Sequence, residues 1–290
     1  MQPALVAGAA DLTGNTGAKL SGQTAMSSSD PGGRQIYYGV REHAMGSIMV
    51  GLALHGGVLP VGGTFFVFFD YMKPPVRLAA LSGAKCVFVF SHDSVGVGED
   101  GPTHQPIEHL AALRAIPDLQ VIRPADANET SAAVRVALDT NGPTVLVLSR
   151  QNLPVCTDGS AVESGAGVVH RPDGAPAVAL VATGSEVSLA LEAARSLADR
   201  GVAAQVVSMP SWDRFEALRR TSPERAEAIL PSSLPTISVE AGATLGWERY
   251  AEVCIGIDRF GASAPGAQAM ERLGISVDHV VDAAIALVGR

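Results

Sequence analysis

Residues 86–109 read CVFVFSHDSVGVGEDGPTHQPIEH. The first five residues are apolar without interruption, as expected of a strand that is buried on both faces. The remainder holds three histidines, two aspartates and two glutamates, and its glycines and prolines disfavour a helix. The stretch therefore predicts a buried strand that ends in a polar loop, which is where α/β proteins place their chemistry.

Short apolar runs and helical patterns alternate on both sides of this stretch. Met45, Ile48, Met49 and Leu52 recur at helical spacing, which predicts a helix from about residue 41 to the glycines at 56–57. The two prolines at 74 and 75 must kink or restart a helix over residues 65–82. We expect further helices at 126–138 and 186–200, and strands at 5–8, 58–64, 87–90, 119–122, 144–148, 178–182, 204–207, 236–239 and 253–257.

This alternation predicts an α/β protein with two consecutive α/β domains, each built on a mostly parallel sheet. A segment rich in Gly, Pro, Ser and Asp separates the two groups of elements and is typical of a linker. We place the first domain at residues 1–155, the linker at 156–175 and the second domain at 176–290.

The composition of the 290 residues narrows the function classes. The formal charge of -8 argues against nucleic-acid binding, and no apolar run approaches the roughly 18 residues of a membrane span. Charged residues make up only 17%, which predicts surfaces covered by other protein. The three scattered cysteines, Cys86, Cys156 and Cys254, show no metal-ligand spacing and, with no signal peptide visible, predict a cytoplasmic location.

Two segments ahead of this stretch carry candidate binding groups. Glu42 lies at the start of an apolar helix, where a carboxyl packed beneath glycines could donate and accept a proton, although it could also simply favour the helix dipole. Phe65, Phe68 and Tyr71 recur every three residues, so one helix face presents three rings. That face could hold a flat heteroaromatic ring, or it could be a stripe facing the core.

Two loops carry candidate substrate groups. His92, Asp100 and His104 supply hydrogen-bonding and acid–base capacity on the glycine-rich loop of residues 91–109. Arg150 follows another strand end, where an arginine can bind a carboxylate or phosphate with two hydrogen bonds. An ordinary exposed arginine and surface histidines would have the same spacing.

Taken together, these segments resemble transketolase, the thiamine-diphosphate enzyme that transfers two-carbon ketol units between sugar phosphates. The resemblance covers nearly the whole chain. It runs through residues 10–13, 39–45, 62–71, 91–106, 123–126 and 149–154, and then through 182–187, 209–212, 239–242 and 260–265. It implies a pyrimidine-binding domain followed by the transketolase C-terminal domain.

The resemblance also implies roles for residues. Glu42 would hydrogen-bond the aminopyrimidine ring of the cofactor, and the rings of Phe65, Phe68 and Tyr71 would surround that ring. Asp11 would lie near the cofactor. The substrate would be bound by His92 and Arg150 at its phosphate and by Asp100 at a hydroxyl, with the catalytic His104 near the reacting carbon.

Only the second half of such an enzyme is present in this sequence. The resemblance therefore implies a split transketolase whose partner subunit carries the diphosphate-binding domain and the Mg²⁺ ligands, with a heterotetramer as the expected assembly and no metal ligands on this chain. Asn15 and Thr16 stand where the family has a phosphate-binding serine, which leaves the phosphate contact of Asn15 open.

Three alternatives stay open. The chain could be a non-catalytic or regulatory half that pairs with a true transketolase, or a split transketolase specialised for an unusual sugar. It could also be half of another thiamine enzyme, such as a 2-oxoacid dehydrogenase or a deoxyxylulose phosphate synthase, but residues 91–106 favour transketolase.

Overall fold

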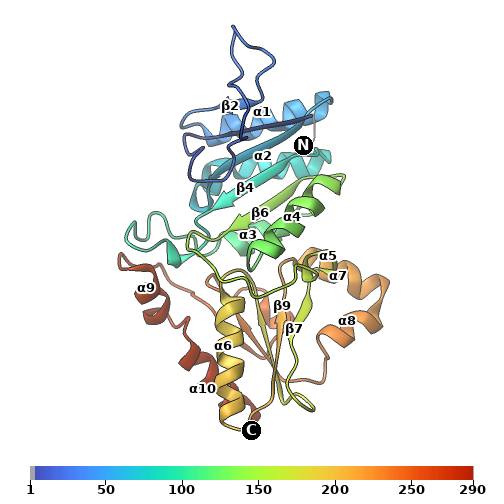
Figure 1. Ribbon diagram of the computed structural model, residues 1–290, viewed down its shortest axis with the longest axis vertical. Helices are drawn as coiled ribbons and strands as arrows, with labels where there is room; N and C mark the ends of the chain where they lie inside the picture. Colours follow the sequence, from blue (N-terminus) through green and yellow to red (C-terminus); the bar gives the residue numbers. More distant parts are fainter. Residues whose placement is uncertain (1–3, 290) are drawn as a thin grey trace.

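A computed structural model describes residues 4–289 as two α/β domains that follow one another along the long axis of the molecule (Figure 1). The first domain is built on a six-stranded, fully parallel sheet in the order β2-β1-β3-β4-β6-β5. Its strands are β1 (Leu5–Ala9), β2 (Gln35–Tyr37), β3 (Leu59–Phe65), β4 (Val87–Ser91), β5 (Gln120–Ile122) and β6 (Thr144–Leu148). Its helices are α1 (Glu42–His55), α2 (Phe69–Ser82), α3 (His109–Arg114) and α4 (Ala127–Asp139).

Helices cover both faces of this sheet, as the uninterrupted apolar strands predict. Because side chains alternate along a strand, Phe88 and Phe90 of β4 pack into the core that holds α1 and α2. Val87 and Val89 pack on the other face with α4. Helix α1 approaches β3 so closely that a Cβ on Gly62 would lie 2.2 Å from Sδ of Met49.

The region predicted as one helix over residues 65–82 divides into a 3₁₀ turn at Phe66–Phe68 and then α2. Helix α2 continues through Pro74 and Pro75 rather than restarting at them. Pro75 is buried against α1, where a Cβ on Gly46 would lie only 2.7 Å from its ring. This packing offsets the backbone hydrogen bonds that the two prolines cannot make.

The second domain is built on a five-stranded sheet in the order β11-β10-β8-β9-β7, in which only the edge strand β7 is antiparallel. Strand β7 and the short helix α5 both form within residues 156–175, the segment predicted as a linker. The strands are β7 (Gly167–His170), β8 (Val178–Ala182), β9 (Ala204–Ser208), β10 (Thr236–Val239) and β11 (Val253–Ile255). The helices are α5 (Ala161–Ser164), α6 (Glu186–Asp199), α7 (Trp212–Thr221), α8 (Pro223–Ile229), α9 (Gly266–Arg272) and α10 (Val277–Val288).

The structure thus confirms the predicted class, two consecutive α/β domains with mostly parallel sheets. Helices α6 and α10 pack on one face of the second sheet, and α7 and α8 pack on the other. Among residues 4–289, no helix is long and apolar enough to cross a membrane.

Candidate active site

The parallel strands of the first sheet bring the predicted site residues to one edge. Because the strands run in the same direction, the segments that follow them all lie at the carboxyl edge of the sheet. Asp11 follows β1, Glu42 follows β2 and Phe65 ends β3. His92 follows β4 and Arg150 follows β6.

Three rings form a row on the outer side of the β3–α2 segment. The ring centroids of Phe65 and Phe68 lie 6.0 Å apart with the planes 13° from parallel, and those of Phe68 and Tyr71 also lie 6.0 Å apart. Tyr71 is 63% exposed, whereas Phe66 and Phe69 on the inner side are buried in the core. This surface stays available for a flat ligand or another chain.

His92 extends the row of rings. Its imidazole stacks on Phe65 with 3.7 Å between centroids, and its Nδ1 lies 3.0 Å from the hydroxyl of Ser91. Burial and, secondarily, the charge of Arg150 lower the pKa of His92, while the charge of Asp100 opposes this shift. The imidazole is therefore mostly neutral near pH 7.

The other candidate residues of the two loops lie near His92. His104 meets Phe68 edge-on with 5.6 Å between ring centroids, and its Nδ1 lies 3.0 Å from the hydroxyl of Thr103. Asp100 and Arg150 are exposed, and both act on the pKa of His92. The structure thus groups two histidines, a carboxylate and a guanidinium beside the row of rings.

The segment after β1 reaches the same place through Asn15. Its backbone carbonyl accepts a hydrogen bond of 3.4 Å from the hydroxyl of Ser91, and the residue is exposed. Thr16 is 2% exposed, and its hydroxyl donates to the carbonyl of Leu12. Of these two residues, only Asn15 can therefore offer its side chain to a ligand.

Glu42 is the first residue of α1 and is 8% exposed. Its carboxylate makes no hydrogen bond or ion pair with any residue between 4 and 289. Neither carboxylate oxygen is among the fully buried unpartnered atoms of the described residues, so the carboxylate reaches the surface and can accept a hydrogen bond from a ligand or another chain. This group and the open row of rings fit a heteroaromatic ring that carries hydrogen-bond donors.

Asp11 lies in a hollow of its own. It adopts a left-handed backbone with φ of 66° and shares the hollow with Tyr37, Gly39 and Arg41, among other residues. Neither the row of rings nor His92 lines this hollow. The structure thus places Asp11 at the same sheet edge as the other predicted residues, in a hollow that they do not line.

One group in the described chain has metal-ligating side chains close together, namely Asp70, Glu108 and His109. Nε2 of His109 lies 3.4 Å from Asp70, and Nδ1 lies 3.8 Å from Glu108. One ligand atom from each of the three residues lies within 4.8 Å of the others, but Asp70 and Glu108 are exposed, and exposed acidic groups are common without an ion. This group therefore does not by itself define a metal centre.

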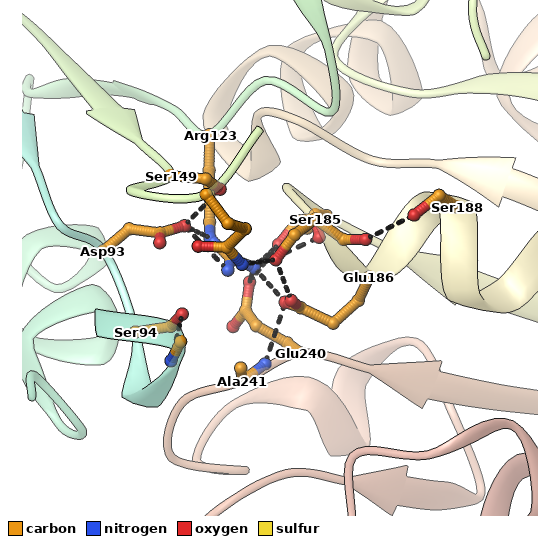
Figure 2. A network of polar contacts seen from close by, with 12 residues as sticks. Asp93, Ser94, Arg123, Ser149, Ser185, Glu186, Ser188, Glu240 and Ala241 are labelled. Carbon is orange, nitrogen blue, oxygen red and sulfur yellow. Dashed lines mark hydrogen bonds and ion pairs between the residues drawn. The ribbon is translucent and has the colours of Figure 1, made fainter. Parts of the chain in front are cut away.

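Sequence reasoning missed a buried charged network where the two domains meet (Figure 2). Arg123, which follows β5, is fully buried and pairs with Asp93 of the first domain and Glu186 of the second. Glu240 lies 4.0 Å from Arg123 and accepts two hydrogen bonds of 2.7 Å from Arg114. Each of the three carboxylates follows a buried strand closely, and this position is the one sign of the network that the sequence offers.

Burial and neighbouring charges act against each other in this network, and burial raises the pKa of Glu186 although the charge of Arg123 opposes the shift. Burial alone would lower the pKa of Arg123, but the charges of Glu186, Asp93 and Glu240 raise it instead. Burial likewise opposes ionisation of Glu240, yet Arg114 and Arg123 lower its pKa to about 2. The network therefore joins the domains through buried ion pairs whose members act on one another's pKa values.

Two family models cover most of the chain. The model for the transketolase pyrimidine-binding domain matches residues 1–155, and the model for the transketolase-like C-terminal domain matches residues 165–276. The transketolases of Geobacillus stearothermophilus and Bacillus subtilis are 50% and 46% identical to this chain, each over 99% of its length. The chain spans only 44% of the length of these relatives.

Solved transketolase structures are also similar to this chain. Transketolase from Leishmania mexicana superposes with a TM-score of 0.95 and 45% identity, over 99% of this chain and 43% of that one. A structure described as a split gene transketolase, an inactive beta4 tetramer, superposes with a TM-score of 0.79 at 25% identity. Here the match covers 99% of this chain and 93% of the other, so the two chains have nearly the same extent.

Proposed function

The chain belongs to the transketolase family, and we propose that it is the catalytic half of a split transketolase that binds the pyrimidine ring of thiamine diphosphate. The observation that carries this proposal is Glu42, a largely buried residue whose carboxylate has no partner in residues 4–289 and is still accessible to a ligand. It lies at the same sheet edge as an open row of rings. A bound aminopyrimidine would supply the missing hydrogen bond.

Each predicted residue then has a defined task toward the cofactor. Glu42 holds a proton between its carboxylate and the pyrimidine ring, and Phe65, Phe68 and Tyr71 hold the plane of that ring. Asp11 lies near the cofactor at the edge of the site. When bound, thiamine diphosphate supplies the electron sink for breaking and forming the carbon–carbon bond.

The loop residues bind and orient the sugar. Arg150 and His92 hold the phosphate, because a guanidinium and an imidazole nitrogen are suited to phosphate oxygens. Asp100 accepts a hydrogen bond from a sugar hydroxyl, and His104 exchanges a proton near the reacting carbon. Asn15 adds a contact from the segment after β1. The reaction transfers a glycolaldehyde unit from a ketose phosphate to an aldose phosphate.

A second polypeptide completes this site. We propose that a partner subunit carries the Mg²⁺ and diphosphate ligands and covers the exposed rings, and that two copies of each chain form a heterotetramer. The neighbour described as a split gene transketolase supports this, because it is a chain of nearly the same extent whose beta4 tetramer is described as inactive.

The test is reconstitution. The purified chain is mixed with the diphosphate-binding half encoded in the same genome, and ketol transfer from xylulose 5-phosphate to ribose 5-phosphate is followed with thiamine diphosphate and Mg²⁺ present. We expect no turnover by either half alone and turnover that saturates at equal amounts of the two. Turnover by the chain alone would contradict the proposal.

The same mixture separates the main alternatives. A non-catalytic half would bind the partner without producing turnover with any pair of sugar phosphates. A half specialised for an unusual sugar is favoured by one observation, namely that Asn15 is exposed and contacts Ser91, the residue before His92. It would show turnover with a different acceptor and a high KM for ribose 5-phosphate.

A further inference from the structure

The backbone at His92 is held in an unfavourable conformation. Its φ of 62° lies in the left-handed region that non-glycine residues rarely adopt. Such a conformation persists only where neighbouring groups hold it in place. The residue that follows, Asp93, is 1% exposed and supplies a carboxylate directly beside it.

This carboxylate connects two loops of the candidate site. Oδ2 of Asp93 accepts a hydrogen bond of 3.0 Å from the hydroxyl of Ser149. Ser149 directly precedes Arg150, and Asp93 directly follows His92. A single oxygen atom therefore sets the spacing between the segments that carry the two proposed phosphate ligands.

The same oxygen is tied to the second domain through Arg123, which follows β5 of the first domain. Arg123 donates to it from Nε at 2.9 Å and lies 2.8 Å away through Nη2. The other end of the guanidinium donates to the carbonyl of Thr183 at 3.1 Å and to its hydroxyl at 2.8 Å. It lies so close to the chain that a Cβ on Gly184 would be 2.5 Å from Cζ.

These contacts connect the second domain to the two segments that carry His92 and Arg150. We infer that Asp93 is a positioning residue, through which Arg123 and the second domain fix the distance between His92 and Arg150. This inference rests on the proposed function, because it takes these two residues as the ligands of the substrate phosphate. The affinity for phosphorylated substrates then depends on the link between Asp93 and Ser149, whereas the chemical step does not.

The sharpest variant is Ser149→Ala in the reconstituted two-subunit enzyme. It removes the hydroxyl that ties the Arg150 segment to Asp93 but leaves the ion pair of Asp93 with Arg123, so no buried charge loses its partner. The matched control is Ser188→Ala. The hydroxyl of Ser188 donates to the carbonyl of Ser185 at the far side of the same network (Figure 2).

The readout compares a phosphorylated donor, xylulose 5-phosphate, with hydroxypyruvate, a ketol donor that carries no phosphate. For Ser149→Ala we expect the KM for xylulose 5-phosphate to rise about threefold to tenfold, the size of one lost hydrogen bond. The KM for hydroxypyruvate and both kcat values should stay within about twofold. Ser188→Ala should change none of them.

The inference would be overturned if Ser149→Ala changed KM equally for both donors, or if the KM for xylulose 5-phosphate stayed unchanged. Failure of the proposed function is a separate result, namely an unaltered enzyme that does not turn over. In that case calorimetry with ribose 5-phosphate decides. If Ser149→Ala binds ribose 5-phosphate more weakly than the unaltered protein does, the positioning role is supported. Equal affinities of the two proteins, or no binding by the unaltered protein, would overturn it.

Discussion

The imidazole of His92 lies on the ring of Phe65, with 3.7 Å between the ring centroids and 24° between the planes. Phe65 ends β3 and His92 follows the neighbouring strand β4, so the sheet itself brings the two rings together. The stack and the hydroxyl of Ser91 at Nδ1 hold the imidazole in one plane. Nε2 has no partner among residues 4–289 and stays available to a substrate.

Because one ring serves both parts of the proposed site, we predict that Phe65→Leu weakens cofactor and substrate together. The dissociation constant for thiamine diphosphate and the KM for the sugar phosphate should each rise about twofold to tenfold, the range for losing one ring-stacking contact. Both are measured in the reconstituted enzyme. The control is Tyr71→Leu, because Tyr71 contacts Phe68 but makes no ring contact with His92, and it should affect the cofactor alone. A Phe65 variant that changed only one of the two constants would contradict the continuity of the site.

Glu42 should matter for turnover and not for folding. We predict that Glu42→Gln lowers kcat about 10²- to 10⁴-fold, the usual contribution of a proton-transfer group, because an amide cannot take up the proton. The melting temperature should stay the same, since the carboxylate has no partner in residues 4–289. His43→Gln, at the exposed next position of the same helix, should leave kcat unchanged. A Glu42 variant with full kcat would remove the main support for the proposed function.

Local patterns were sufficient to predict most of the fold and the grouping of candidate residues. The apolar run of β4 and the glycines after it act over a few residues, and parallel strands then bring the segments after them to one edge. Strand β7 was harder to predict from sequence. It has only four residues, and it lies between glycine-rich segments that are typical of a linker.

The charged network could not be predicted in this way. Asp93, Arg123, Glu186 and Glu240 come from segments up to 147 residues apart, and they meet only because the two domains pack against each other. Isolated charges of this kind are usually exposed, so their types and positions give no sign of burial. The network depends on how the domains pack, which no local pattern records.

A second buried carboxylate at the junction of the domains should make stability depend on pH. Burial raises the pKa of Glu129 to about 7, although hydrogen bonds from Ser208 and the Ala125 backbone oppose the shift. Because the folded pKa lies above the unfolded one, the stabilising contribution is complete below about pH 4.5 and is lost as the pH rises through 7.

We therefore predict that Glu129→Gln flattens the fall in the free energy of unfolding between pH 5 and pH 8. The amide keeps both contacts, because its oxygen can accept from Ala125 and its nitrogen can donate to the Ser208 hydroxyl. Urea unfolding at several pH values, compared between variant and unaltered chain, measures this difference. Parallel curves for the two proteins would show that Glu129 titrates alike in the folded and unfolded states.

The final prediction concerns the stability of the junction itself. Arg123→Met should destabilise the chain by about 3–5 kcal/mol, because it leaves Asp93 and Glu186 buried without their cation. The matched control is Arg219→Met, which breaks an exposed ion pair with Glu216 and should cost at most about 1 kcal/mol. Adding Glu186→Gln to Arg123→Met should restore part of the loss, because one unpaired buried charge is then removed. Urea unfolding of the three variants measures these differences, and equal losses from Arg123→Met and Arg219→Met would mean that the buried network contributes no more than a surface pair.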